Sequence, residues 1–96
     1  MKKITHSPWG AVQHQSEIAD GITQVSTASH GGLVLSDERL QAMPEQYKIN
    51  NYGGGRYFEE DCEWALVCLA FPEAFSAEHH AAAIATARMF YKSLAV

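Results

Sequence analysis

Residues 59–71 read Glu-Glu-Asp-Cys-Glu-Trp-Ala-Leu-Val-Cys-Leu-Ala-Phe, an acidic opening followed by an apolar run. Acidic residues are frequent at the start of a helix because the exposed backbone N–H groups and the positive end of the helix dipole favour negative charge. The run from Trp64 onward is apolar on both sides of a helix, which is typical of a helix buried on both sides. Pro72 marks its end. The stretch predicts a buried helix over about 59–70.

Two further helices are predicted from their capping signals. Ser76 is an N-cap for a helix over about 77–94, which contains no Pro or Gly. Ser36 is an N-cap for a short helix over about 37–43, and Pro44 blocks its continuation. The i, i+3, i+4, i+7 rule assigns an inward face to the last helix. That face comprises His80, Ala83, Ile84, Ala87, Phe90, Tyr91 and Leu94.

Strand signals precede the helices. Residues 11–15 and 22–28 are predicted strands, the second rich in β-branched types. Gly31-Gly32 is predicted to be a two-residue hairpin turn, with residues 33–35 as the returning strand. Residues 56–58 predict a short further strand or lead-in.

The predicted hairpin fixes a register. A turn at Gly31-Gly32 places His30 opposite Leu33 and Ala28 opposite Leu35, all on one face. Strands first and helices after predict an α+β fold, in which a small antiparallel sheet packs against the two longer C-terminal helices.

Length and composition limit the class of protein. The 96 residues are 47% hydrophobic, which predicts one small globular domain over 1–96, with residues 1–6 flexible. No apolar stretch reaches the roughly 18 residues of a membrane span, so no membrane partner is expected. Cys62 and Cys68 would point about 240° apart on a helix, too far round for a disulfide. We expect free thiols, a reducing compartment and a cytoplasmic location.

The formal net charge is −4, and its distribution is uneven. Acidic and basic residues cancel over 1–58, whereas residues 59–87 contain acids and neither Lys nor Arg. Such a region repels phosphates, and no basic patch with interleaved aromatic residues occurs elsewhere. Direct binding of nucleic acid is therefore not expected.

Several short motifs occur in a fixed order along the chain. They are Pro8-Trp9-Gly10, the segment 26–32 (Ser-Thr-Ala-Ser-His-Gly-Gly), Met43-Pro44, the segment 59–64 and Phe71-Pro72-Glu73. In this combination, over residues 7–75, the chain resembles an uncharacterised small domain of phage, plasmid and other mobile-element proteins. The resemblance implies a mobile-element origin and no defined activity, so it assigns no catalytic residue.

The first candidate site is the acidic corner, defined as Glu59, Glu60, Asp61 and Glu63. On a helix, Glu63 shares a face with Glu59 and Glu60, and paired carboxylates can hold a cation or act as acid and base. The favoured interpretation is a solvated first helical turn that satisfies the helix dipole. A third interpretation is a docking surface for a basic partner.

His30 is the second candidate. Ser29 precedes it, but adjacent strand residues point to opposite faces, and Ser26 lies about 13 Å away along a strand. A serine hydrolase is therefore not favoured. We expect His30 to hydrogen-bond a carboxylate of the acidic corner; a metal or catalytic role and an exposed partner contact are the alternatives.

The remaining motifs carry weaker signals. The Gly53-Gly54-Gly55 tract lacks the Lys-Ser/Thr of a phosphate loop. His79 and His80 project about 100° apart, and Cys62, Cys68 and a histidine do not match zinc spacing. No metal site and no cofactor are predicted. Trp9, Tyr52 and Tyr57 are candidate anchors for a partner.

Three functions remain open at this stage. The first is a non-enzymatic module that binds a host protein with a basic surface, in its sharpest form an anti-restriction or anti-CRISPR inhibitor. The second is a small metal-assisted hydrolase or transferase that uses His30 with Glu60, Asp61 or Glu63. The third is an accessory structural domain that self-associates, as a homodimer, through its Ala-rich last helix.

Overall fold

The computed structural model describes residues 3–48 and 55–96. Its strands are β1 (His6–Ser7), β2 (Gly10–Ala11), β3 (His14–Ala19), β4 (Ile22–Ser26), β5 (Gly31–Leu35) and β6 (Tyr57–Glu59). Its α-helices are α1 (Asp37–Ala42), α2 (Trp64–Ala70) and α3 (Ala77–Phe90). Short 3₁₀ turns occur at Glu45–Tyr47, Pro72–Ala74 and Lys92–Leu94.

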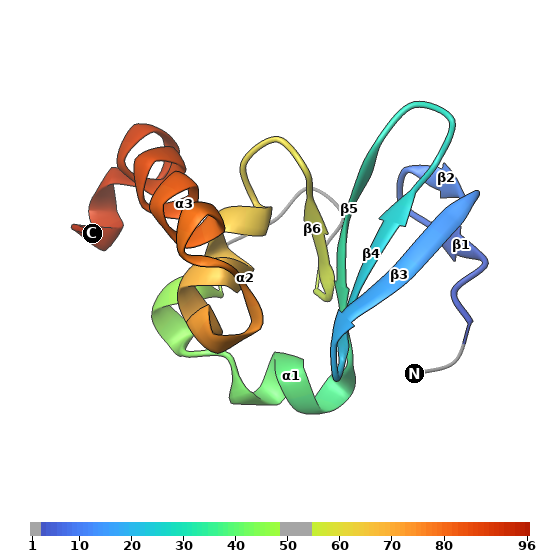
Figure 1. The fold of residues 1–96 in the computed structure, drawn as a ribbon, viewed down its shortest axis with the longest axis horizontal. Coiled ribbons are helices and arrows are strands. Elements are labelled where there is room, and N and C mark those ends of the chain that lie inside the picture. The colour runs from blue at the N-terminus through green and yellow to red at the C-terminus, as the bar shows by residue number, and fades with distance from the viewer. Residues whose placement is uncertain (1–2, 49–54) are drawn as a thin grey trace.

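The sheet lies between a small hairpin and the helices. Strands β3, β4, β5 and β6 pair antiparallel in that spatial order, and β1 pairs with β2 as a separate two-stranded hairpin. Figure 1 shows α2 and α3 on the β6 side of the molecule and the β1–β2 hairpin on the other. The predicted α+β class, a small antiparallel sheet with two longer C-terminal helices, is confirmed.

The two faces of the sheet are covered differently. Ile22, Leu33 and Leu35 pack with Leu66 and Val67 of α2 in the main core, together with Phe58, Met43 and Phe71. On the opposite face, a Cβ placed on Gly32 would lie 2.5 Å from the Cη2 atom of Trp9. The Trp9 ring therefore rests on β5, which places the β1–β2 hairpin over this face.

The predicted turn at Gly31-Gly32 is wrong. Both glycines lie within β5, and Ser26 pairs with Gly31, so residues 27–30 form the turn. The Thr27 side chain closes this turn by accepting from the His30 N–H at 3.1 Å and donating to the His30 carbonyl at 2.7 Å. The glycines serve close approach instead, because the space above Gly32 is filled by Trp9 and by the backbone of β6.

The corrected turn changes the predicted pairing. Leu33 pairs with Gln24 rather than His30, and Leu35 pairs with Ile22 rather than Ala28. The predicted strand at 11–15 is replaced by β2 and by β3, which begins only at His14. Near the N-terminus, Ile4 exchanges two hydrogen bonds with the Gln15 side chain, at 3.1 and 2.9 Å.

Helix α2 starts later than predicted. The expected start at residue 59 is wrong, because Glu59 ends β6 and residues 60–63 form a turn before Trp64. The burial of Ala65, Leu66, Val67 and Cys68 confirms a helix covered on more than one side.

The end of the last helix also differs. Helix α3 stops at Phe90, because Tyr91 leaves the helical conformation (φ −129°, ψ 58°). The Tyr91 hydroxyl instead donates to Cys62 Sγ at 3.5 Å. Ala83 and Ala87 are buried as predicted, but Phe90 is 58% exposed and does not face inward.

Other predictions are met or lie outside the described residues. Ser36 and Ser76 cap α1 and α3 as predicted, accepting from Arg39 N and His79 N. The Gly53-Gly54 part of the glycine tract and Tyr52 fall in the segment 49–54, which the structure does not describe. Within the described residues, no helix combines the length and the apolar character that a membrane crossing requires.

Candidate functional site

The Glu59 side chain organises the turn between β6 and α2. Its Oε1 atom accepts from the N–H groups of Cys62 at 2.8 Å and Glu63 at 3.3 Å, and its Oε2 atom accepts from Asp61 N–H at 3.1 Å. These N–H groups belong to the turn immediately before α2. One carboxylate from the preceding strand thus holds the turn that leads into the helix, in place of the predicted row of solvated acids.

The environment of Glu59 favours its charged form. Burial raises the pKa of this carboxyl, but the hydrogen bonds from Cys62, Asp61 and Glu63 together outweigh burial and leave the pKa below its usual value. Glu63 is also buried, and its Oε1 accepts from Glu59 N–H at 3.0 Å. Two members of the acidic corner are therefore structural, with their oxygens directed at backbone N–H groups.

His30 converges on this turn from the β4–β5 hairpin. Its Nε2 atom lies 3.8 Å from Glu59 Oε2 and 3.6 Å from Asp61 Oδ2. One ligand atom from each of the three residues lies within 4.8 Å of the others. The predicted contact between His30 and a carboxylate of the acidic corner is thus present as an ion-pair distance, longer than a hydrogen bond.

A polar cleft of about 500 Å³ opens beside these groups. We define it by its lining residues, which are Pro8, Trp9, Ser29, His30, Glu59, Cys62 and Glu63. The Cys62 thiol donates to Glu59 Oε1 at 3.3 Å. Burial raises the pKa of Cys62, and the neighbouring Glu59 and Glu63 raise it further. A protonated thiol is a poor nucleophile, so cysteine catalysis is not favoured here.

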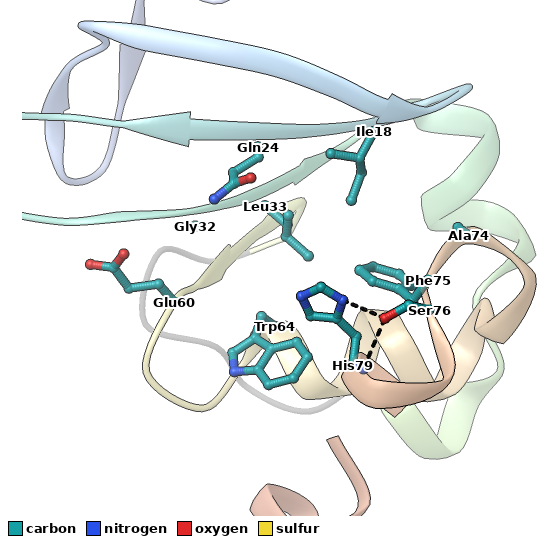
Figure 2. Close-up of a pocket in the computed structure, with 10 residues that line it drawn as sticks. All are labelled: Ile18, Gln24, Gly32, Leu33, Glu60, Trp64, Ala74, Phe75, Ser76 and His79. Atoms are coloured by element: carbon teal, nitrogen blue, oxygen red, sulfur yellow. Dashed lines mark hydrogen bonds between the residues drawn. The ribbon is translucent and has the colours of Figure 1, made fainter. Parts of the chain in front are cut away.

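A second, apolar cleft of about 480 Å³ lies between the sheet and the helices. Its lining residues are Ile18, Gln24, Gly32, Leu33, Glu60, Trp64, Ala74, Phe75, Ser76 and His79. Figure 2 shows Ile18 and Leu33 pointing from the strands towards the rings on the helical side, with Glu60 at one end. Ile18 is 39% exposed, so the strand side of this cleft presents apolar surface to solvent.

His79 completes the apolar cleft. Its ring lies edge-on to Trp64 and Phe75, with centroids 6.5 and 6.4 Å away. Its Nδ1 atom lies 2.8 Å from Ser76 Oγ, the atom that also caps α3. The N-cap thus positions an imidazole between two aromatic walls (Figure 2).

The predicted site residues are divided between the two clefts. Glu60 lines the apolar cleft, where its Oε2 accepts from Gly31 N–H at 3.1 Å, whereas Glu59 and Glu63 line the polar cleft. Asp61 is exposed and turned towards His30. The convergence on His30 therefore includes Asp61 and also Glu59, which was not among the carboxylates expected to act with it.

The predicted anchors Trp9, Tyr52 and Tyr57 differ in what the structure shows of them. Trp9 is half-buried on the sheet, with the Tyr57 ring edge-on at 6.2 Å, so neither ring stands free of the surface. Tyr52 lies outside the described residues. The residues missed by sequence reasoning are the exposed Ile18 and the pair Phe75 and His79. For His79 the sequence offered one signal, the Ser76 N-cap, which fixes the position of His79 in the first turn of α3.

Comparison with known proteins gives a family and no activity. No match was found among curated proteins or among solved structures. A family model described as a domain of unknown function, DUF7007, matches residues 2–93. This match extends past the 7–75 expected from the motifs and includes the last helix. The chain therefore belongs to the DUF7007 family of domains of unknown function.

Proposed function

We propose that the protein is a non-enzymatic module that binds a partner protein through its apolar cleft and the exposed Glu60 at the end of that cleft. The single observation that carries this proposal is the pairing of an open apolar cleft with one exposed carboxylate. Leu33, Trp64 and Phe75 offer apolar contact, and Glu60 offers negative charge at the end of the same cleft. Protein interfaces commonly combine a buried core in which aromatic residues are enriched with a polar, solvent-accessible rim.

The chemistry of the cleft favours a partner that presents an apolar side chain next to a basic one. A large apolar side chain would occupy the space between Ile18 and Phe75, and a neighbouring Arg or Lys would reach Glu60. Residues 59–87, which supply Glu60, Trp64 and Phe75 to the cleft, contain neither Lys nor Arg. Complementary charge of this kind raises association rates and excludes acidic partners.

The proposal extends to the origin of the protein and to the class of its target. The motifs that resemble mobile-element proteins support an origin in a phage or plasmid and action in the cytoplasm of a bacterial host. Enzymes that handle nucleic acids present basic surfaces, so the proposed target is a host defence enzyme of the restriction or CRISPR type. In the self-associating alternative, the exposed Phe90 and Met89 of α3 would form the contact.

Selection from a displayed random peptide library tests the proposal. The wild-type protein should enrich peptides that combine an apolar residue with a nearby Arg or Lys. Glu60→Lys reverses the exposed charge and also removes the acceptor of Gly31 N–H, whereas Glu60→Gln removes the charge and keeps an acceptor; both variants should lose these peptides. Glu38→Lys on α1 is the matched control, because Glu38 is also exposed and lies outside the cleft.

Two outcomes would contradict the proposal. One is enrichment that is the same for the wild type and Glu60→Lys, and the other is enrichment of acidic peptides. Reversal of Glu59 or Glu63 is unsuitable as a test, because both side chains hold backbone N–H groups and their loss would disturb the fold.

The convergence of His30, Glu59 and Asp61 favours a second candidate function, metal-assisted hydrolysis or transfer. In this form Asp61 would act with His30, while Glu60 lines the other cleft and Glu63 is bound to the backbone. The candidate requires first that the three residues bind a metal ion.

A further inference from the structure

We propose that His30, Glu59 and Asp61 form a binding site for a divalent transition-metal ion, with Zn²⁺ preferred over Mg²⁺ and Ca²⁺. The site is independent of the protein-binding proposal, because it lies in the polar cleft and uses none of the residues that line the apolar one. It also draws on two separate segments of chain, which is why its members show no metal-ligand spacing in the sequence.

The distances suit a shared ion better than direct pairing. The separations of 3.6 and 3.8 Å from His30 Nε2 exceed those of an N–H···O hydrogen bond. Two ligand atoms on a tetrahedral ion with bonds of about 2.1 Å lie about 3.4 Å apart. The three ligand atoms lie within 4.8 Å of one another, and rotation of the exposed His30 and Asp61 side chains would bring them towards that spacing.

Glu59 and His30 are held in place, whereas Asp61 is exposed and can adjust to an ion. Glu59 is fixed by hydrogen bonds that occupy Oε1 three times but Oε2 only once, through Asp61 N–H. The second lone pair of Oε2 remains for an ion. Because these hydrogen bonds already hold the carboxylate in one position, binding of an ion costs it little further conformational entropy.

The histidine ring is held in the tautomer that binds metals. Its Nδ1 atom lies 3.0 Å from the Ser29 carbonyl oxygen, which can only accept, so Nδ1 carries the proton. In the neutral ring Nε2 is then unprotonated and faces the carboxylates. Metal-binding histidines typically donate their other ring N–H in this way. Thr27 fixes the His30 backbone on both sides.

The donor set selects the ion. One imidazole nitrogen favours Zn²⁺ and its neighbours over Mg²⁺ and Ca²⁺, which prefer all-oxygen sites. Three protein ligands leave one position or more for water or a donor from a bound molecule, as in open zinc sites. That open side adjoins the polar cleft between His30 and Glu59.

Isothermal titration calorimetry of the metal-free protein with ZnCl₂ tests the site. We expect one equivalent to bind and to raise the melting temperature. His30→Ala and Asp61→Asn should each weaken binding at least about tenfold. Both residues are exposed, so neither change should prevent folding. His14→Ala is the matched control, because His14 is an exposed histidine on β3 outside the cleft.

The same titration contains the results that would overturn the site. Binding that is unaffected by His30→Ala, or is lost equally in His14→Ala, would mean that surface histidines bind the ion non-specifically. Absence of stoichiometric binding would mean that His30 is simply an ion-pair partner of two carboxylates. Equal affinity for Ca²⁺ and Zn²⁺ would contradict the proposal that the His30 imidazole selects the ion. None of these results bears on the peptide selection.

Discussion

Glu59 and Glu60 are adjacent in the sequence, yet they serve opposite sides of the sheet. Glu59 turns into the polar cleft, where it is 12% exposed and binds three backbone N–H groups and a thiol. Glu60 stays exposed at the end of the apolar cleft and accepts one hydrogen bond, from Gly31 N–H. Glu59 is the last residue of β6 and Glu60 is the first residue of the following turn, so the backbone directs their side chains differently, and a pair of identical acids becomes one structural group and one candidate recognition group.

The comparison extends to the two cysteines. Cys62 lines the polar cleft and bonds to Glu59 and Tyr91. Cys68 is fully buried with Ala65 and Ala83, behind Trp64 and Phe75 of the apolar cleft. The turn is thus stabilised by hydrogen bonds on the side of the polar cleft and by packing of apolar side chains on the side of the apolar cleft. The two sides should respond to different perturbations.

The largest effect is expected from removing the Glu59 carboxylate. Glu59→Ala leaves the N–H groups of residues 61–63 without their acceptor, and we expect the free energy of unfolding to fall by about 3 kcal/mol. Glu60→Ala should cost less, about 1 kcal/mol, because it removes a single, partly buried hydrogen bond. Urea denaturation of both variants measures the difference. Equal losses would mean that the burial of Glu59 has no structural role.

A smaller effect is expected from alkaline pH at Cys68. Burial raises the pKa of this thiol from 9.0 to about 11, so the folded state resists its deprotonation. The stability that Cys68 contributes is complete below pH 9 and is lost as the pH rises towards 11. The full loss amounts to roughly 2–3 kcal/mol.

Urea midpoints between pH 8 and 11 measure this loss, and Cys68→Ala supplies the control, because a thiol that is absent cannot titrate. The variant should start less stable at pH 8 but decline less steeply. A parallel decline in both proteins would assign the alkaline loss to other groups. Thiol reagents at pH 8 should modify the half-buried Cys62 first and Cys68 only on unfolding.

Features that are determined by nearby residues could be predicted from the sequence, whereas features that depend on contacts with distant residues could not. The caps at Ser36 and Ser76 were predictable, because an N-cap is satisfied within three residues. The hairpin turn was not, because Gly31 and Gly32 are explained by contacts with distant residues, Trp9 among them. A Gly-Gly pair has the same local signature whether it makes a turn or admits a neighbouring ring.

The candidate site shows the same limit. The acidic corner was singled out as a candidate site, and His30, which was expected to hydrogen-bond one of its carboxylates, lies at ion-pair distance from Glu59 and Asp61. The position of Glu59 was not predictable, because pairing of β6 with β5 places it on a strand rather than in a helix. The apolar cleft combines Ile18, Leu33 and Phe75 from remote segments, and each of them alone resembles an ordinary core residue.

The smallest effect on stability is expected at Ile18, and it sharpens the comparison from the apolar side. Because Ile18 is already 39% exposed, Ile18→Ser should change the free energy of unfolding by no more than about 0.5 kcal/mol. It removes apolar surface from the cleft, so selected peptides should bind at least about tenfold more weakly, which requires only the roughly 1.4 kcal/mol of one buried aliphatic group. Fluorescence of Trp64, a wall of the same cleft, follows the titration. Unchanged peptide affinity in a stably folded Ile18→Ser protein would remove Ile18 from the docking surface and leave Glu60 and the aromatic rings to carry recognition.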